Sequence, residues 1–360
     1  IDLIRKFDIF RQQQLVQQPR VMHGDPKLAN ILFSQQQAVA LIDFDTIMTG
    51  LWHYDVADAL RSLCNTQSEN GDINQVSFDL SLFSAFMRGY APALLVWTAA
   101  ERAMLMSAIA LLPLDLGSRF LFGCHQNHPL RLEAQPKAAA HKSLVQLRLF
   151  EDIQAKQPLI EQILQQVMPK ALVTHPQEPQ LPPIMIETAI RQQNQQLEVF
   201  YHLQSVEPLL DVLAPVPLAR SVENQAKGLW QHNCLEVFIA NQGQQAYLEF
   251  NGAATQQSDL FVFSHERVNA QGVATSHNVL PSCATQGQWH WLYSQVNRHQ
   301  ALAKLSLDLE SVADVVDTKQ PIEYSVTAVV QDNQGQYYYL ALKHCRLQPD
   351  FHARESFGLG

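Results

Sequence analysis

The stretch VMHGDPKLANILF, residues 21–33, places a histidine, an aspartate and an asparagine within eight positions between two apolar segments. Phosphoryl transfer needs a carboxylate beside the acceptor hydroxyl and oxygen ligands that hold magnesium against the transferred phosphate. A D-x-x-x-x-N pattern followed by an aspartate at the end of a nearby strand can meet both needs. Asp25 and Asn30 form the first pair, and Asp43 ends the apolar segment VALID.

On this interpretation, Asp25 orients or deprotonates the acceptor hydroxyl, and His23 braces the loop. Asn30 and Asp43 bind the metal ion. The alternative is a plain polar turn at HGD, with Asp43 and Asp45 forming a solvated strand end. The full combination favours catalysis, because four fixed residues at average usage coincide by chance on the order of once in several hundred chains of this length.

The composition indicates two domains and excludes several classes of protein. The chain has 360 residues, of which 47% are hydrophobic, more than one core usually organises. A formal charge of −9 argues against a nucleic-acid partner, which would require a basic surface. The apolar window nearest to a membrane span, residues 104–116, is interrupted by Pro113 and Asp115. We therefore expect a soluble protein with no membrane partner.

The cysteines are scattered along the chain. No two of them form a C-x-x-C pair, so the sequence predicts neither a disulfide framework nor a zinc site. Free thiols are typical of a reducing compartment, and we expect a cytoplasmic protein. The cysteines are Cys64, Cys124, Cys234, Cys283 and Cys345.

The first half of the chain is predicted to be mainly helical, with a little sheet. Apolar residues recur at helical spacing over 1–18, 54–63, 80–90, 99–122 and 137–167. The short apolar segments RVMHGD, NILF and VALIDF predict small strands around the HGD loop.

The second half is predicted to be all-β. The segment MPKALVTHPQEPQLPP, residues 168–183, is rich in proline and lacks apolar periodicity, which favours an extended linker. Beyond it, strand-length segments separated by turn residues predict a β-sandwich over residues 184–360. These segments are LEVFYHL, CLEVFIAN, AYLEFN, DLFVFSHE, WHWLYSQV, AKLSLDL, YSVTAVVQ and YYYLALKH. The predicted fold class is α+β, with a helical domain over residues 1–167.

Two stretches of the first domain, HGDPKLANILF and VALIDFDTIMTGLWHYDVADALRS, resemble the aminoglycoside and choline phosphotransferase superfamily. Its fold is similar to that of protein kinases. Within it, the run DTIMTGL followed by YD and DALR is most similar to the N-acetylhexosamine 1-kinases and the related proteins called mucin desulfatases. LPLDLGSRFLFG and HKSLVQLRLFEDI are similar to the terminal helices of that group. The resemblance covers residues 1–167.

This resemblance implies a kinase-like C-terminal lobe that uses ATP and Mg²⁺ to phosphorylate a sugar hydroxyl. One feature departs from the family, because such kinases also use an upstream N-lobe with a phosphate-covering loop and a strand lysine. Only one predicted helix precedes His23. We expect the N-lobe either upstream of Ile1 or absent from an inactive remnant that binds carbohydrate or protein. A kinase for an aminoglycoside or choline is a third hypothesis.

The resemblance also implies a sugar pocket. Asp45, Arg61 and Arg119 are its predicted substrate ligands, although Arg61 could equally pair with Asp58 or lie exposed on its helix. Asp55 is expected to be a helix cap or a loop anchor.

In the second half, residues 227–263 and the segment PDFH, residues 349–352, resemble DOMON-like domains related to family 9 carbohydrate-binding modules. The resemblance covers residues 184–360 and implies a β-sandwich that binds sugar or another small ligand. The F-N-x-S-P-S run of that family is FNGAAT here, residues 250–255, which weakens any inference from this loop.

Indole rings can stack on sugars, while carboxylates and amides can bind sugar hydroxyls, so we predict a glycan site in this domain. Its residues are Trp230, Trp289, Trp291, Glu236, Glu249 and Asn251. A core position is the alternative for each tryptophan. The WHW segment places Trp289 and Trp291 on one side of a strand and His290 on the other.

Overall fold

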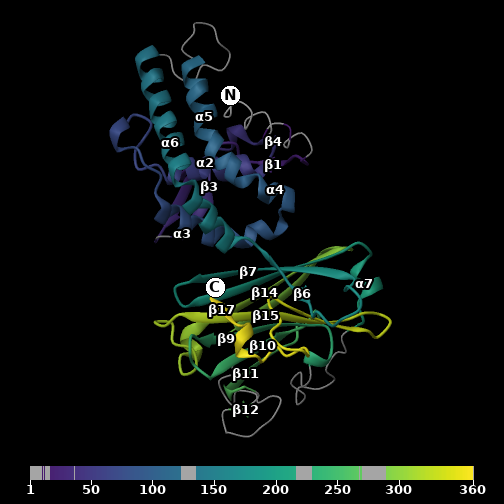
Figure 1. Cartoon of the computed structure of the whole chain (residues 1–360). Coiled ribbons are helices and arrows are strands. Elements are labelled where there is room, and N and C mark those ends of the chain that lie inside the picture. Colours follow the sequence, from purple (N-terminus) through teal and green to yellow (C-terminus); the bar gives the residue numbers. More distant parts are fainter. Residues whose placement is uncertain are drawn as a thin grey trace. The chain divides into compact units, whose positions relative to one another are not determined.

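The computed structural model describes residues 10, 12, 17–35, 37–122, 135–215, 229–266, 268–269 and 289–359, with only the backbone of 268, 269, 289 and 359. The chain divides into two compact units (Figure 1). The first unit comprises Ile1–Tyr90 and Trp97–Val167. The second comprises Ala91–Val96 and Met168–Gly360.

The first unit is mainly helical. Its helices are α2 (Trp52–Leu63), α3 (Leu80–Tyr90), α4 (Ala99–Ala103), α5 (Leu105–Phe122) and α6 (Pro136–Val167). Its strands are β1 (Arg20–Met22), β2 (Ile31–Ser34), β3 (Gln37–Leu41) and β4 (Met48–Gly50). β1 pairs with β4 and β2 pairs with β3, both antiparallel. α5 packs against α2 and α6.

The segment predicted as one helix over residues 99–122 forms two helices, α4 and α5. The Thr98 hydroxyl accepts a hydrogen bond from the Glu101 N–H at 3.1 Å, and the Glu101 carboxylate accepts one from the Thr98 N–H at 2.6 Å. This capping box fixes the start of α4. Met104 is the C-cap of α4, and α5 begins at the next residue. The predicted helix over residues 1–18 falls mostly outside the described residues.

Among the described residues, α5 is long and apolar enough to cross a membrane by length and composition, and 44% of it is buried inside the protein. This differs from our expectation that no such window exists, because Pro113 and Asp115 lie within a continuous helix. Leu105, Ile109 and Phe120 of α5 are buried. A position in the core of the helical unit also accounts for this apolar composition.

The second unit is a β-sandwich. Its elements are β5 (Lys170–Ala171), β6 (Val173–Thr174), β7 (Ile184–Gln193), β8 (Gln196–Ser205), α7 (Leu209–Val212), β9 (Cys234–Asn241), β10 (Tyr247–Gly252), β11 (Ser258–His265), β12 (Val268–Asn269), β13 (Trp289–Asn297), β14 (Gln300–Asp308), β15 (Ile322–Gln331), β16 (Tyr337–Ala341) and β17 (Gly358–Leu359). One sheet is eight-stranded, in the order β12-β11-β10-β9-β15-β16-β6 with β17 beside β15. The other is five-stranded, in the order β13-β14-β8-β7-β5.

Alternate residues of the two sheets, such as Val199, Val237 and Leu305, form one common core between them. Each strand predicted in the second half is present, so the sandwich and the α+β class are confirmed.

The beginning of the predicted linker is part of this sandwich instead. β5 pairs with β7, while β6 pairs with β16, so residues 170–174 join one sheet to the other. Leu172, between the two short strands, is buried in the common core. Strands of two residues are too short to show periodicity, and the prolines that follow them conceal the signal.

Candidate active site

The HGD loop follows β1, and a glycine shapes its turn. Gly24 has a φ of +84°, a conformation that side-chain-bearing residues rarely adopt. A Cβ atom added at Gly24 would lie 2.6 Å from the carbonyl oxygen of Thr46. The loop therefore passes so close to the segment before β4 that only glycine fits.

A carboxylate from α2 fixes the backbone of this loop. Asp55 Oδ2 accepts a hydrogen bond from the His23 N–H at 2.6 Å, and Asp55 Oδ1 accepts one from the Gly24 N–H at 2.9 Å. The expectation that Asp55 anchors a loop is confirmed. Both of its oxygens are used in this way.

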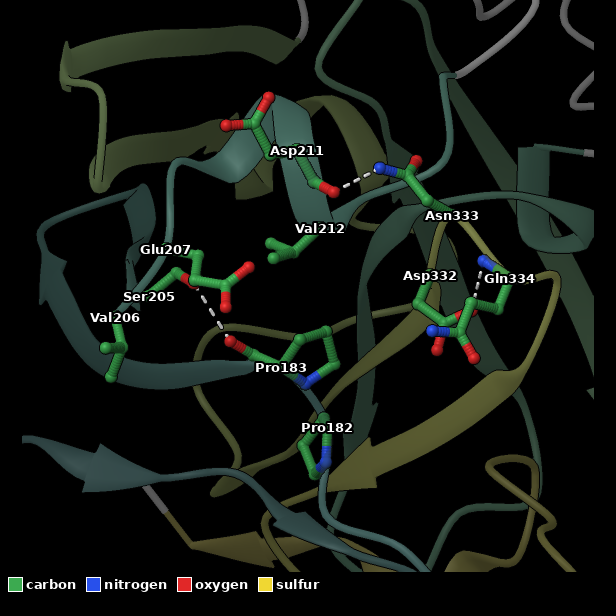
Figure 2. Close-up of a pocket in the computed structure, with 10 residues that line it drawn as sticks. All are labelled: Pro182, Pro183, Ser205, Val206, Glu207, Asp211, Val212, Asp332, Asn333 and Gln334. Carbon is green, nitrogen blue, oxygen red and sulfur yellow. Dashed lines mark hydrogen bonds between the residues drawn. The ribbon is translucent and has the colours of Figure 1, made fainter.

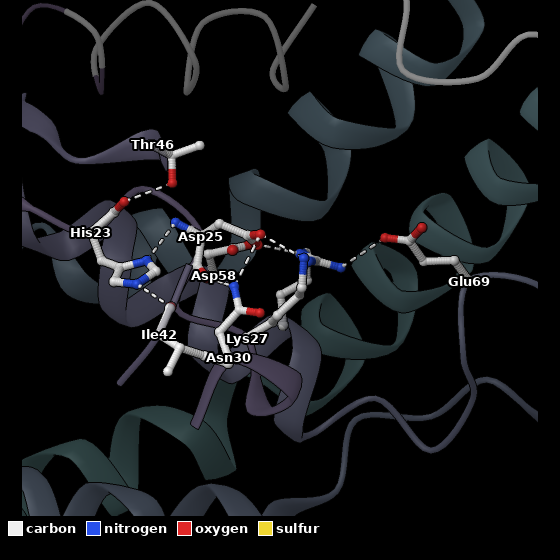
Figure 3. Close-up of polar contacts among 9 residues, drawn as sticks. His23, Asp25, Lys27, Asn30, Ile42, Thr46, Asp58 and Glu69 are labelled. Atoms are coloured by element: carbon white, nitrogen blue, oxygen red, sulfur yellow. Dashed lines mark hydrogen bonds and ion pairs between the residues drawn. The ribbon is translucent and has the colours of Figure 1, made fainter. Parts of the chain in front are cut away.

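The His23 side chain is buried and contacts both the loop and the residue that follows β3. The Asp25 N–H donates to His23 Nδ1 at 3.3 Å, which leaves Nε2 to carry the proton and donate to the carbonyl oxygen of Ile42 at 3.0 Å. The Thr46 hydroxyl donates to the His23 carbonyl oxygen at 2.8 Å (Figure 3). These contacts place His23 as a brace between the loop and the end of β3.

Asp25 has two polar neighbours from its own loop (Figure 3). Lys27 Nζ lies 2.5 Å from Asp25 Oδ2. Asn30 Nδ2 donates to the Asp25 carbonyl oxygen at 2.8 Å and to Asp25 Oδ2 at 3.3 Å. The carboxylate is thus held by an ammonium group and an amide.

Lys27 is a residue of the site that our sequence analysis missed. Its hydrogen bond with Asp25 raises the pKa of Lys27 above the ordinary 10.5; burial opposes this rise, while the charges of Asp25, Asp43 and Asp58 add to it. Lys27 therefore carries its positive charge among three carboxylates. The sign of this contact in the sequence was that Lys27 lies two residues after Asp25.

Asn30 and Asp43 emerge at the same end of the β2–β3 hairpin. The Ile42 N–H donates to the Asn30 carbonyl oxygen at 2.9 Å, which brings the residue before Asp43 beside Asn30. Asp43 is exposed and has a φ of 68°, so it stands at a sharp turn. Asn30 is buried.

The free oxygens of this pair suit a hard cation such as Mg²⁺. Within the described residues, neither Asn30 Oδ1 nor the Asp43 carboxylate makes a hydrogen bond or an ion pair. The described residues as a whole contain no group of three or more His, Cys, Asp or Glu side chains that could hold a metal ion. A magnesium ion here would therefore depend on further oxygens from a phosphate or water.

The predicted substrate ligands have different surroundings. Asp45 is exposed in the short 3-10 helix η2 (Phe44–Thr46), next to Asp43. Arg61 is buried and pairs with Asp58 at 2.7 Å, which is the structural alternative considered above. Arg119 pairs with Asp115 of its own helix at 3.7 Å. Of the three, Asp45 is the one that adjoins the predicted metal ligands in the chain and is exposed.

The structure does not support a sugar-stacking role for Trp291. This side chain is 6% exposed and belongs to the common core, where it packs against Tyr201 and Phe250. Its indole N–H donates to the Ala253 carbonyl oxygen at 2.9 Å. Trp230 is partly buried against Phe261. The side chain of Trp289 falls outside the described residues.

The polar residues predicted to bind glycans are also interior. Glu236, Glu249 and Asn251 are 2%, 1% and 0% exposed. Glu236 accepts a hydrogen bond from Thr327 at 2.8 Å, and Glu249 accepts one from Asn251 at 2.8 Å. Burial, helped by the charge of Glu249, raises the pKa of Glu236 to about 8. These side chains offer no surface to a sugar, which corrects our prediction of their role.

Residues 2–93 match the family model described as the phosphotransferase enzyme family. The match spans about a quarter of the chain and includes Asp25, Asn30 and Asp43.

Carbohydrate-binding proteins are among the solved structures that match the chain. A candidate carbohydrate-binding protein from Bacteroides uniformis shares 13% identity, covering 56% of this chain and 89% of its own, at a TM-score of 0.38. A family 9 carbohydrate-binding module from Caldicellulosiruptor kristjanssonii, in complex with glucose, shares 9% identity, covering 46% of this chain and 69% of its own, at a TM-score of 0.29. TM-scores this low do not establish a common fold, so we assign no ligand to the sandwich from these structures.

Proposed function

We propose that the first unit is the catalytic lobe of an ATP-dependent phosphotransferase that acts on a sugar hydroxyl. The observation that carries this proposal is the Asp25 carboxylate, held by Lys27 and Asn30 in a loop that Asp55 fixes by two backbone hydrogen bonds. The match of residues 2–93 to the phosphotransferase enzyme family supports the same class of reaction.

Asp25 acts on the acceptor in this proposal. Its carboxylate accepts a hydrogen bond from the acceptor hydroxyl and directs that oxygen toward the terminal phosphorus of ATP. It takes up the hydroxyl proton as the new O–P bond forms and the bond from that phosphorus to the bridging oxygen breaks, with ADP as the leaving group. The Lys27 ammonium, paired with this carboxylate, offsets negative charge on the transferred group. His23 and Asp55 keep both residues in position through the loop backbone.

Asn30 and Asp43 would hold Mg²⁺ through their side-chain oxygens. When bound, the ion would neutralise charge on the phosphates of ATP. Mg²⁺ commonly takes one or two protein ligands and completes its shell with water and phosphate oxygens, which fits this small set of donors.

The exposed apolar side chains of the β2–β3 hairpin support a binding surface for the nucleotide. Leu32, Phe33 and Val39 are exposed on this hairpin, whose two strands lie between Asn30 and Asp43 in the chain. Apolar side chains exposed beside polar reacting groups are typical of a binding surface. We assign this surface to the base of ATP.

An N-acetylhexosamine is the acceptor that we propose, because the run from Asp45 to Arg61 resembles the N-acetylhexosamine 1-kinases. Asp45 is the residue we expect to bind a sugar hydroxyl, since it is exposed beside Asp43. A cytoplasmic location goes with this proposal, and the described thiols of Cys64, Cys234 and Cys345 are free.

The test is ADP release by the complete natural polypeptide with a panel of acceptors: N-acetylhexosamines, choline and an aminoglycoside. We expect release with an N-acetylhexosamine that falls to background in Asp25→Asn. Asp314→Asn, at an exposed site in the sandwich, is the matched control and should keep full activity. Equal release by the wild type and Asp25→Asn with every acceptor would refute the proposal. Release with choline alone would refute the choice of sugar.

A further inference from the structure

A pocket of about 490 Å³ lies in the second unit and is separate from the predicted glycan residues (Figure 2). Three segments form its walls: the prolines at 182 and 183, the chain from the end of β8 through α7, and the turn between β15 and β16. Its volume lies within the range of sites for small molecules.

Hydrogen bonds between the walls hold this pocket in shape. The Ser205 hydroxyl donates to the Pro183 carbonyl oxygen at 3.0 Å. The Asn333 N–H donates to the Val212 carbonyl oxygen at 3.1 Å, and its side-chain amide donates to the carbonyl oxygen of Asp211. A pocket whose walls are already joined loses little freedom when a ligand binds.

The charge in the pocket selects the kind of ligand. Figure 2 shows the Glu207 carboxylate turned toward the middle of the pocket, whereas that of Asp211 points away. Within the described part of the chain, Glu207 makes no hydrogen bond or ion pair. None of the described lining residues is Lys, Arg or His. The pocket therefore favours a cation and disfavours a phosphate or carboxylate group.

Asp332 has a different role, because its carboxylate is used in hydrogen bonds within the wall of the pocket. Its carboxylate accepts hydrogen bonds from the N–H groups of Gln334 and Gln336, at 2.8 and 2.9 Å, and from the Tyr338 hydroxyl at 3.1 Å. Glu207 is thus the carboxylate in the pocket with oxygens left for a ligand.

The remaining lining suits hydroxyl groups and C–H surfaces. The side-chain amides of Asn333 and Gln334 can bind hydroxyls, while Pro183 and Val212 offer apolar contact. We infer that this pocket binds a small polyhydroxylated amine of the amino-sugar class. Its ammonium group pairs with Glu207, its hydroxyls meet the amides, and its ring lies over the proline and valine. This inference is independent of the phosphotransferase proposal.

Calorimetric titration of the full chain tests this inference, with glucosamine as the probe and glucose as its neutral counterpart, at a pH that keeps the amine protonated. We expect glucosamine to bind more tightly than glucose, and Glu207→Gln to weaken glucosamine about fivefold without changing glucose. Glu310→Gln, an exposed glutamate elsewhere in the sandwich, is the matched control. Heat that is the same for the wild type and Glu207→Gln is assigned to sites other than this pocket.

A second measurement tests whether the ligand binds in this pocket. In protein with labelled valine methyl groups, glucosamine should shift the Val212 signal in the wild type at lower concentration than in Glu207→Gln. Unchanged glucosamine affinity in Glu207→Gln, or equal affinity of the wild type for glucose and glucosamine, would overturn the assignment.

Discussion

Asp55 shows how one residue can determine the shape of a loop that lies some thirty positions earlier in the chain. Its two carboxylate oxygens satisfy the backbone N–H groups of His23 and Gly24. The residue types in HGDPKLAN indicate the chemistry of the loop, and the expected anchor role of Asp55 was correct. The sequence did not indicate that Lys27 would contact Asp25, because spacing alone does not give the direction of a long flexible side chain.

Gly24→Ala tests the close passage of this loop. The new Cβ would lie 2.6 Å from the Thr46 carbonyl oxygen at a residue with a φ of +84°. We expect the free energy of unfolding of the first unit to fall by about 2 kcal/mol. Chemical denaturation followed by circular dichroism measures this change. The control is Gly89→Ala in α3, where an added Cβ meets nothing within 4 Å; an equal loss in both variants would contradict the strain at Gly24.

At the scale of elements, the periodicity of the sequence located most helices and strands but not their surroundings. α3 runs over the predicted residues 80–90, whereas the helix predicted over 99–122 is divided. The T-x-x-E sequence of the capping box at Thr98 was a readable sign of that division. In β13, alternation correctly separated Trp291 from His290, which is exposed. Alternation could not show which of these faces is buried, since that depends on the second sheet.

Trp291→Ala tests the core position of this residue. Removing a buried indole that packs on Tyr201 and Phe250 should lower the free energy of unfolding of the sandwich by about 3–5 kcal/mol. His290→Ala, on the exposed face of the same strand, should change it by less than about 0.5 kcal/mol. If thermal unfolding shows Trp291→Ala to be as stable as the wild type, the core assignment fails.

A row of polar residues crosses four strands of the eight-stranded sheet and predicts a pH dependence. Thr327, Glu236, Asn251 and Asp259 are successive partners on β15, β9, β10 and β11. Burial, together with the Glu249 charge, raises the pKa of Glu236 from 4.5 to about 8. The folded state therefore keeps a proton that the unfolded chain releases above its lower pKa. This contribution to stability is complete below pH 4.5 and is lost as the pH rises toward about 8.

Glu236→Gln, which cannot ionise, should remove this loss. We expect the urea midpoint of the wild-type sandwich to fall between pH 5 and pH 8 by more than that of Glu236→Gln. Glu310→Gln, at an exposed position, should behave as the wild type. The same pH slope in Glu236→Gln and the wild type would show that Glu236 does not titrate in this range.

At the scale of the whole molecule, the chain combines two units of different architecture. Composition and strand pattern were sufficient to predict a helical body followed by a sandwich. The short strands at residues 170–174 and the membership of Ala91–Val96 in the second unit were not predictable, because both depend on contacts between segments far apart in sequence. The proposed chemistry belongs to the first unit, which contains residues 2–90 of the stretch that matches the phosphotransferase enzyme family.

Transfer of the labelled terminal phosphate of ATP to N-acetylglucosamine or N-acetylgalactosamine, in the presence of Mg²⁺, tests the central role of Asp25 most directly. We predict a labelled sugar phosphate with the wild type and with Asp314→Asn, and a rate lower by about a hundredfold or more with Asp25→Asn. Labelled sugar phosphate formed at the same rate by Asp25→Asn and the wild type would contradict this role.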